Sequence, residues 1–409
     1  MGYAAAVSAD PVSPEDRLRR AEVALQQGDV DGGCAQIRSL VAENLTRKDL
    51  ILAAADILIR SGQAVQALLL LEHGFAHHAG SPALFERFVT AGSAAGAEVR
   101  ETVAQIAGRL PDNAKLLSRL GCWFMNEGRL EEGMNALARA ERLGSDDVTT
   151  YVALALGYFR SDRKEQAIAA ISKAVRLDPL DPSALHIQAS LTGADVKSSS
   201  PVFVERLFDT FAETFDKKLV QDLKYRTPQD VVTVLKSVRP DPKAFGRFLD
   251  VGCGTGLIAE ALATHYRIEE SIGIDLSQKM LDQSRKKGLY QQLLHGDAVE
   301  LLYDFEESID LVACIEVPIY VGDLWPMTGA VAACLKPGGL YVYSIETLST
   351  GTYRLLPTQR FAHSIKYVEN IAASFGLTPV AGLDTVIRVE MGVAVQGYVG
   401  VLIKSDAAS

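Results

Sequence analysis

The stretch Phe248-Leu-Asp-Val-Gly-Cys-Gly-Thr-Gly256 decides how this sequence folds. Its apolar part, Phe248–Val251, predicts a buried strand, and the glycine-rich part leads into the helical pattern Leu257–Ala263. Glycines let the backbone turn tightly and let a ligand approach it without a side-chain clash. The unpaired N–H groups of the first helical turn suit a carboxylate or a phosphate. We therefore interpret this stretch as a loop that binds a cofactor.

The spacing of the glycines distinguishes two kinds of cofactor loop. A dinucleotide-binding loop would have a third glycine at position 257, where this chain has leucine, so the dehydrogenase interpretation fails. The pattern Asp250-x-Gly252-x-Gly254-x-Gly256 instead resembles the first motif of class I S-adenosylmethionine-dependent methyltransferases. The resemblance implies S-adenosylmethionine as cofactor, with contacts from Asp250, Gly252, Cys253, Gly254 and Gly256. Cys253 is a small residue that the turn tolerates, and we do not expect it to act as a nucleophile.

Further matches to this family follow in the right order. The apolar run Ser271–Asp275 ends in an acid, at the position where the family binds the ribose hydroxyls. His295–Ala298 resembles the segment whose acid meets the adenine amino group, Asp310–Val317 the fourth strand, and Leu335–Gly339 the turn before the fifth. The resemblance adds as cofactor contacts Asp275, Leu276, Met280, Asp297, Ala298 and Cys314. It also implies a seven-stranded sheet with helices on both faces.

The flanking sequence resembles a narrower group, the predicted bacterial methyltransferases that carry tetratricopeptide repeats. The matching segments are Phe203–Asp216, Leu223–Pro228 and Arg360–Val368. Tyr225 and Arg226 follow an amphipathic helix, so we expect them on a helical lid, residues 203–240, over the cofactor pocket. There Arg226 can pair with the methionine carboxylate of the cofactor. The alternative is a surface arginine beside a core tyrosine.

An internal repeat of 34 residues marks the N-terminal part of the chain. Leu120, Phe124, Leu137 and Ala140 recur as Leu154, Tyr158, Ile171 and Ala174. This is the period of tetratricopeptide helix pairs. The repeat is clear over 114–181. It is weaker over 14–47 and 48–81, which keep the glycine turn at Gly28 and Gly62 with apolar residues at helical spacing, and 82–113 matches it poorly. Each helix pair leaves an apolar face uncovered, so we predict about five stacked copies.

These patterns divide the chain into two domains. We assign residues 1–191 to a tetratricopeptide-like α-solenoid, capped by a helix that starts near Ser183. Residues 203–409 form the predicted methyltransferase domain, with a Rossmann-like core at 245–405. The stretch 192–202 is small, polar and poor in helix formers, so we expect a linker there.

Two residues are candidates for removing a proton from the methyl acceptor. Glu316 follows the fourth strand, where class I enzymes often place a residue that faces the substrate; alternatively it only ends the strand. His363 precedes Ser364, which predicts a helix N-cap, and it can act as a general base or pack against the helix start. His73 and His77 have the spacing of metal ligands on a helix, but we expect a solvated helix face. We predict no metal site, since the sulfonium charge already activates the methyl group.

Composition limits the expected partners and location. The formal net charge of −10 lacks the basic surface that binding to a phosphate backbone requires. The segment after the fourth strand also lacks the Asn/Asp-Pro-Pro-aromatic run of enzymes that methylate bases, so we do not expect a nucleic-acid substrate. Five scattered cysteines without a CxxC pair fit a reducing cytoplasm. No apolar run is long enough to predict a membrane span.

Three functions stay open on this basis. The first is a methyltransferase that acts on an oxygen or nitrogen atom of a small molecule, with the helical array serving oligomerisation or partner recruitment. The second is a protein methyltransferase whose array grips the polypeptide substrate. The third is an interaction protein whose methyltransferase domain is silent. The intact Asp250, Asp275 and glycines argue against the third function.

Overall fold

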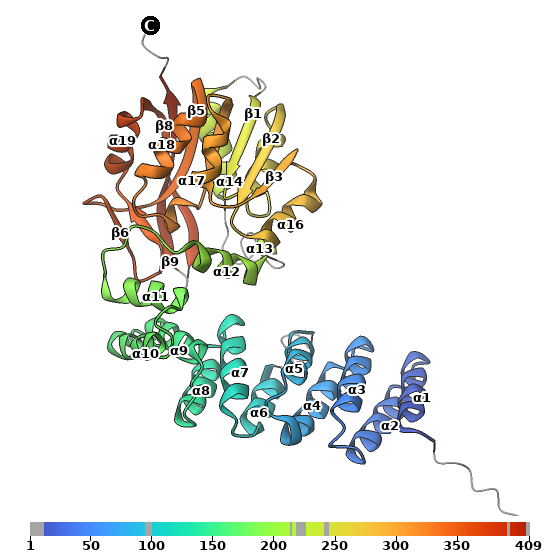
Figure 1. Cartoon of the computed structure of the whole chain (residues 1–409). Helices are drawn as coiled ribbons and strands as arrows, with labels where there is room; N and C mark the ends of the chain where they lie inside the picture. The colour runs from blue at the N-terminus through green and yellow to red at the C-terminus, as the bar shows by residue number, and fades with distance from the viewer. Residues whose placement is uncertain are drawn as a thin grey trace, which may run out of the picture. The chain divides into compact units, whose positions relative to one another are not determined.

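The computed structural model describes residues 12–94, 100–212, 215–217, 226–240, 245–390 and 393–405. Figure 1 shows helices in the N-terminal part of the chain and a sheet with helices in the C-terminal part. The chain forms two compact units, of which the first ends at Pro179 and the second begins at Leu180. Each unit has a hydrophobic core of its own.

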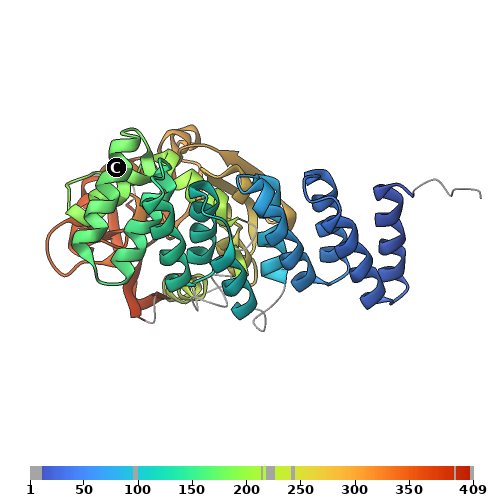
Figure 2. The same ribbon diagram turned by 90° about the horizontal axis from the view of Figure 1, so that it is seen from below.

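Ten helices make up the described part of the first unit. They are α1 (Pro14–Gln26), α2 (Val30–Ala42), α3 (Lys48–Arg60), α4 (Ala64–His78), α5 (Pro82–Ala94), α6 (Arg100–Arg109), α7 (Ala114–Asn126), α8 (Leu130–Arg142), α9 (Val148–Arg160) and α10 (Lys164–Leu177). They follow one another as five pairs, which Figure 2 shows side by side along the unit. The pairs begin at Pro14, Lys48, Pro82, Ala114 and Val148, at or near the predicted period.

The turn inside a helix pair requires a left-handed backbone. Gly28, Gly62 and Gly128 have φ angles of 89°, 73° and 76°, and Asp162 takes the same position in the last pair with φ 57°. Glycine adopts this conformation without steric cost. The two turns predicted from glycine alone, at Gly28 and Gly62, are present in the structure.

Small residues at repeated positions let paired helices approach each other closely. A Cβ atom on Gly121 of α7 would lie 2.4 Å from Leu137 Cγ and 3.0 Å from the backbone oxygen of Gly133 in α8. Leu137 is fully buried, and so are the next copy's Leu154 and Ile171. The repeat in the sequence therefore marks residues of the first unit's core.

The second unit begins earlier than we predicted. The helix α11 (Pro182–Thr192), which we assigned to the repeat domain as its cap, belongs to the second unit. The His186 ring stacks on Phe203 of α12 (Pro201–Phe211), with the ring centroids 4.3 Å apart. His186 Nε2 also lies 2.9 Å from the backbone oxygen of Gln359. Through these two contacts, the buried His186 joins α11 to the rest of the second unit.

The stretch 192–202 also differs from the linker that we expected. Ser199 N donates a hydrogen bond to the backbone oxygen of Tyr320 at 2.9 Å. Gly322 N donates to the backbone oxygen of Lys197 at 2.8 Å. This stretch is therefore fixed against the segment that follows the fourth strand, and it is part of the second unit.

A nine-stranded sheet forms the centre of the described second unit. Its strands are β1 (Phe245–Val251), β2 (Ile268–Asp275), β3 (Gln292–His295), β4 (Ile309–Cys314), β5 (Leu335–Thr347), β6 (Tyr353–Leu355), β7 (Phe361–His363), β8 (Leu377–Glu390) and β9 (Val393–Lys404). Parallel pairing joins β3, β2, β1, β4 and β5 in that order, and the antiparallel strands β9 and β8 follow. These are seven strands, as predicted. The short hairpin of β6 and β7 adds two that the sequence did not predict.

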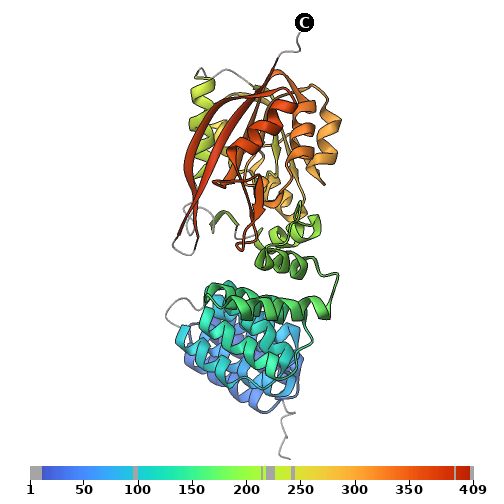
Figure 3. The same ribbon diagram turned by 90° about the vertical axis from the view of Figure 1, so that its left-hand side faces the viewer.

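Helices cover both faces of the sheet. Besides α11 and α12, the second unit contains α13 (Phe215–Lys217), α14 (Thr227–Val238), α15 (Leu257–Ala263), α16 (Gln278–Lys287), α17 (Ala298–Leu302), α18 (Trp325–Cys334), α19 (Ile365–Ser374) and the 3-10 turns η3 (Tyr303–Phe305) and η4 (Pro318–Tyr320). The helices α14 and α15 share a core with Leu311 and Ala313, whereas α17, α18 and α19 share one with Val312 and Cys314. Neighbouring residues of β4 thus point to opposite faces. Figure 3 shows α14 beside the long hairpin of β8 and β9.

Candidate active site

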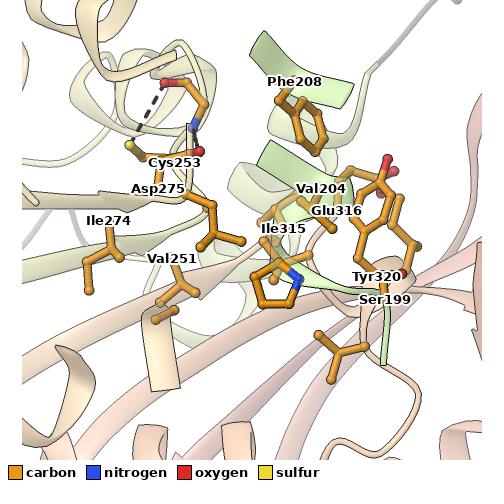
Figure 4. Close-up of a pocket in the computed structure, with 18 of the residues that line it drawn as sticks. Ser199, Val204, Phe208, Val251, Cys253, Ile274, Asp275, Ile315, Glu316 and Tyr320 are labelled. Atoms are coloured by element: carbon orange, nitrogen blue, oxygen red, sulfur yellow. Dashed lines mark hydrogen bonds between the residues drawn. The ribbon is translucent and has the colours of Figure 1, made fainter. Parts of the chain in front are cut away.

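A cavity of about 670 Å³ opens at the carboxyl ends of β1, β2 and β4. In the sheet, β2 lies on one side of β1 and β4 on the other, so the strand order reverses direction at β1. Open α/β sheets bind ligands at such a topological switch point. Figure 4 shows Cys253 and Asp275 on one side of the cavity and Glu316 and Tyr320 on the other. Phe208 of α12 also lines the cavity.

The glycine loop has the conformation of a cradle for a ligand. Gly252 and Gly254 have φ angles of 66° and 53°, which L side chains rarely adopt. A Cβ atom on Gly252 would lie 2.2 Å from Val317 Cγ2, so only glycine fits this position. The loop therefore leaves its backbone open to the cavity that it lines.

Two backbone donors orient the carboxylate of Asp275. Gly254 N donates to Oδ2 and Ser277 N donates to Oδ1, each at 2.8 Å. Burial raises the pKa of Asp275, and the backbone hydrogen bonds oppose this shift. A carboxylate keeps further lone pairs after two such bonds. The residues present thus fit a ligand with a polar body and a diol, as S-adenosylmethionine has.

Seven of the predicted cofactor residues line this one cavity. They are Gly252, Cys253, Gly254, Asp275, Leu276, Asp297 and Ala298. They come from the glycine loop, the end of β2 and the start of α17, which are separated along the chain. Asp297 Oδ1 also accepts a hydrogen bond from Val299 N at 2.8 Å, so the same residue caps α17.

Besides Arg226, four predicted cofactor residues do not line the cavity. Met280 and Cys314 are fully buried in the core, because their positions on α16 and β4 direct them away from the cavity. Gly256 is the N-cap residue of α15. Asp250 lies beneath the loop and accepts a hydrogen bond from Tyr290 OH at 2.6 Å. These assignments are corrected: the four residues support the loop or the core.

Among the described residues, only part of the predicted lid lies at the cavity. Arg226 is exposed, forms an ion pair with Asp230 at 3.5 Å and does not line the cavity, so the expected clamp on the cofactor carboxylate is corrected. Tyr225 lies outside the described residues. The following helix, α14, packs on the sheet face. Of the stretch 203–240, only α12 and α13 contribute to the described cavity wall.

The described lid helices α12 and α13 each contribute a carboxylate that accepts a hydrogen bond from a residue in the glycine loop or beside Asp275. Asp209 Oδ1 of α12 accepts a hydrogen bond from Ser277 Oγ at 2.6 Å. Asp216 of α13 accepts one from Thr255 Oγ1 of the glycine loop, and Lys287 Nζ lies 2.9 Å from its other oxygen. We did not predict these contacts, since they join segments that are far apart in the sequence.

Glu316 lines the cavity as predicted. It has an uncommon left-handed backbone, with φ 59°. Its carboxylate accepts a hydrogen bond from Ser344 Oγ at 3.1 Å and one from Arg388 Nη1 at 3.1 Å. Burial raises the pKa of Glu316, while the charges of Arg388 and Arg360 oppose the shift. Glu316 is thus the one of our two catalytic candidates that faces the cavity.

His363 does not line the cavity, and its assignment as a general base is corrected. Its ring is fully buried, and Nε2 donates to the backbone oxygens of Val321 at 2.8 Å and Gly322 at 3.1 Å. Burial lowers the pKa of His363 to about 4. The histidine therefore fixes the segment after β4 and packs in the interior, which was the alternative that we left open.

Several polar residues that line the cavity were not predicted from the sequence. They are Lys197, Ser199, Thr255, Tyr320, Asp323, Arg360 and Arg388. Arg388 is buried near the end of β8, where an arginine within an apolar strand pattern was the signal that could have identified it. No cluster of three metal-ligating side chains occurs among the described residues. In that same part of the chain, we find no helix with the length and apolar character needed to span a membrane.

Comparison with known proteins places a methyltransferase domain at these residues. Residues 249–343 match the family model described as a methyltransferase domain. The ubiquinone biosynthesis O-methyltransferase of Coxiella burnetii (strain Dugway 5J108-111) is 36% identical over 99 residues, 24% of this chain and 42% of that protein. The one of Bordetella avium (strain 197N) is 34% identical over 152 residues, 32% of this chain and 62% of that protein. This chain therefore spans about half the length of these curated relatives.

Solved structures of methyltransferases also resemble the chain. The magnesium protoporphyrin IX methyltransferase from Synechocystis PCC 6803, with bound SAH, aligns with a TM-score of 0.39 at 15% identity, over 50% of this chain and 100% of that chain. The 1,6-didemethyltoxoflavin-N1-methyltransferase of Burkholderia thailandensis gives 0.40 at 17% identity, over 52% of this chain and 93% of that chain. The family match and the curated relatives show that this chain carries a methyltransferase domain, whose cofactor is S-adenosylmethionine.

Proposed function

We propose that this chain transfers the methyl group of S-adenosylmethionine to an oxygen or nitrogen atom of a small-molecule acceptor. The observation that carries the proposal is the cavity of about 670 Å³ in which the glycine loop and Asp275 share walls with Glu316. Cavities of this size suit small ligands. The two curated relatives are named O-methyltransferases, which supports oxygen as the acceptor atom.

Backbone and carboxylate groups on one side of the cavity bind the cofactor in this proposal. Asp275 accepts hydrogen bonds from the two ribose hydroxyls, because its carboxylate is already oriented by Gly254 N and Ser277 N. Asp297 contacts the adenine end, as the family resemblance implies. The glycine loop approaches the ligand closely, since Gly252 and Gly254 have no Cβ atom.

The other side of the cavity aligns the acceptor. The bound cofactor supplies a methyl group that its sulfonium charge has activated. Apolar side chains, among them Phe208, Phe211 and Ile315, exclude water and hold the acceptor in line with the methyl carbon. Glu316 can take up a proton where the acceptor carries one.

The helical unit adds a second element to the proposal. Its five helix pairs start about every 34 residues, the period of tetratricopeptide repeats, and such arrays bind protein segments or mediate oligomerisation. In this proposal the helical array recruits a protein partner or mediates oligomerisation, and the chain works in the cytoplasm. The array also favours the second candidate, a protein methyltransferase whose array grips the polypeptide substrate.

A labelling experiment separates these functions. The purified chain is incubated with methyl-labelled S-adenosylmethionine and an extract of its source cell, and small molecules are then separated from protein. We expect the label among the small molecules, and not in a parallel reaction with Asp275→Ala. Label in a polypeptide would favour the protein methyltransferase. No transfer, with cofactor binding intact, would favour the silent interaction protein.

A further inference from the structure

A buried ion cluster lies at the acceptor side of the cavity. Arg388 of β8 bonds Glu316 Oε2 through Nη1 at 3.1 Å and Glu346 Oε1 of β5 through Nη2. The side chains of Arg388 and Glu346 are only 4% and 5% exposed, whereas that of Glu316 is 21% exposed. Of the three, Glu316 and Arg388 line the cavity. One arginine thus connects a core carboxylate with a carboxylate that a ligand can reach.

A further contact fixes the backbone and the side chain of Glu316 together. Ser344 Oγ accepts a hydrogen bond from Glu316 N at 2.8 Å and donates one to Glu316 Oε1 at 3.1 Å. The left-handed φ of 59° costs stability in a residue with a Cβ atom, and it persists only where surrounding contacts impose it. Ser344, Glu346 and Arg388 impose it here from two strands.

The two carboxylates of the cluster differ in their access to the cavity. A single carboxylate would neutralise Arg388, and Glu346 already does so from within the core. The second carboxylate, Glu316, is the one at the cavity. The other charged or titratable groups that face it are Arg360, whose charge lowers the pKa of Glu316, and Tyr320 of η4, whose own pKa is raised by burial. Glu316 is therefore the carboxylate of this cluster that a ligand in the cavity can reach.

We propose that Arg388 and Glu346 are positioning residues that hold the Glu316 carboxylate towards the acceptor, so that Glu316 accepts the proton of a hydroxyl or ammonium group there. This inference rests on the proposed function. In the step, the acceptor heteroatom bonds to the methyl carbon, the bond between that carbon and sulfur breaks, and its electron pair stays on sulfur as S-adenosylhomocysteine. The acceptor's proton passes to Glu316 and then to water.

An analogue of the cofactor tests this without knowledge of the acceptor. Sinefungin carries an amine-bearing carbon in place of the methylated sulfonium, so its ammonium group extends to where the methyl group is transferred. An ionised Glu316 held at that place binds this ammonium group, and S-adenosylhomocysteine gains nothing from it. The ratio of the two affinities, measured by calorimetry between pH 5 and 8, therefore reports on the Glu316 carboxylate alone.

We expect Glu316→Gln to reduce the affinity for sinefungin about tenfold or more and to leave that for S-adenosylhomocysteine unchanged. Variants of the two positioning residues should shift the pH dependence of the affinity ratio in opposite directions. Glu346→Gln removes a like charge and lowers the pKa of Glu316, so the preference for sinefungin persists to lower pH. Arg388→Met removes the opposite charge, raises this pKa and confines the preference to higher pH. Arg388→Lys should restore part of the wild-type profile.

Glu270→Gln is the matched control. Glu270 is half-buried and forms an ion pair with Arg247 at 2.7 Å, but it does not line the cavity, so its loss should change neither affinity nor profile. The inference is overturned if Glu316→Gln keeps the wild-type ratio, or if Glu346→Gln keeps the wild-type pH profile. Because Glu346→Gln alone tests the positioning, a failure of Arg388→Met to fold does not prevent a decision. Failure of the wild-type chain to bind S-adenosylhomocysteine would instead contradict the proposed function.

Discussion

Asp275 is the residue through which the proposed cofactor site can be tested most directly. Its carboxylate is oriented by two backbone donors at the edge of the cavity. We expect Asp275→Ala to weaken binding of S-adenosylhomocysteine by about 1.5 to 3 kcal/mol, the range for hydrogen bonds to a charged group. Calorimetry measures this affinity. Asp282→Ala is the control, because Asp282 is an exposed acid on α16 that forms an ion pair with Arg285 of the same helix. Equal affinity of wild type and Asp275→Ala would contradict the assignment.

Asp250 should make stability depend on pH. Burial beneath the glycine loop raises the pKa of Asp250 to about 7, and the charge of Asp275 adds to this shift. Between the ordinary value near 4 and about 7, the folded state keeps a proton that the unfolded chain releases, so the free energy of unfolding falls as pH rises through that window.

Asp250→Asn removes this contribution and still offers Tyr290 an acceptor oxygen. We expect the wild type to lose roughly a few kcal/mol of stability relative to Asp250→Asn between pH 4 and pH 7. Thermal unfolding of both proteins across this range measures the difference. A difference that stays constant with pH would show that Asp250 titrates alike in the folded and unfolded chains.

At the scale of elements, the short lid of α12 and α13 is joined to the cofactor side by Asp209 and Asp216. We expect Asp216→Asn to weaken binding of S-adenosylhomocysteine by about 1 kcal/mol, since the charge-assisted bonds from Thr255 and Lys287 that hold α13 near the loop are lost. Glu260→Gln is the control, because Glu260 contacts the same Lys287 from α15 at 3.0 Å. The same loss of affinity in both variants would mean that Lys287, and not the lid, matters.

At the scale of the whole molecule, the place where the second unit begins decides which fragment folds. We expect residues 180–409 to be soluble and to bind S-adenosylhomocysteine like the full chain. Residues 200–409 should be less stable by roughly 2 kcal/mol or more, because Phe203 loses its contact with His186 and the backbone bonds of Lys197 and Ser199 are lost.

Thermal unfolding and calorimetry of the two fragments test this boundary. Equal stability would place the boundary near residue 200, as the sequence suggested. An insoluble 180–409 fragment would show that the second unit depends on the helices before it.

The sequence by itself determined the elements that depend on local spacing. The short apolar runs at β1, β2 and β4 and the glycines at 252 and 254 specify strands and a tight turn with little help from the rest of the chain. The recurrence of Leu120 and Leu137 after 34 residues marked helix pairs in the same way. Seven cofactor residues predicted from these motifs do line one cavity.

Only the tertiary structure decided the acceptor side and the domain boundary. Arg388 and Glu346 meet Glu316 because β8 and β5 reach the cavity through long-range strand pairing, which no local pattern specifies. The chemistry of imidazole made His363 a candidate general base, but its Nε2 donates hydrogen bonds to backbone oxygens of the segment after β4. The polar stretch 192–202 has the composition of a linker, but backbone hydrogen bonding to that same segment fixes it. In each case the partner lies far away in the sequence, and side-chain burial and pairing depend on that partner.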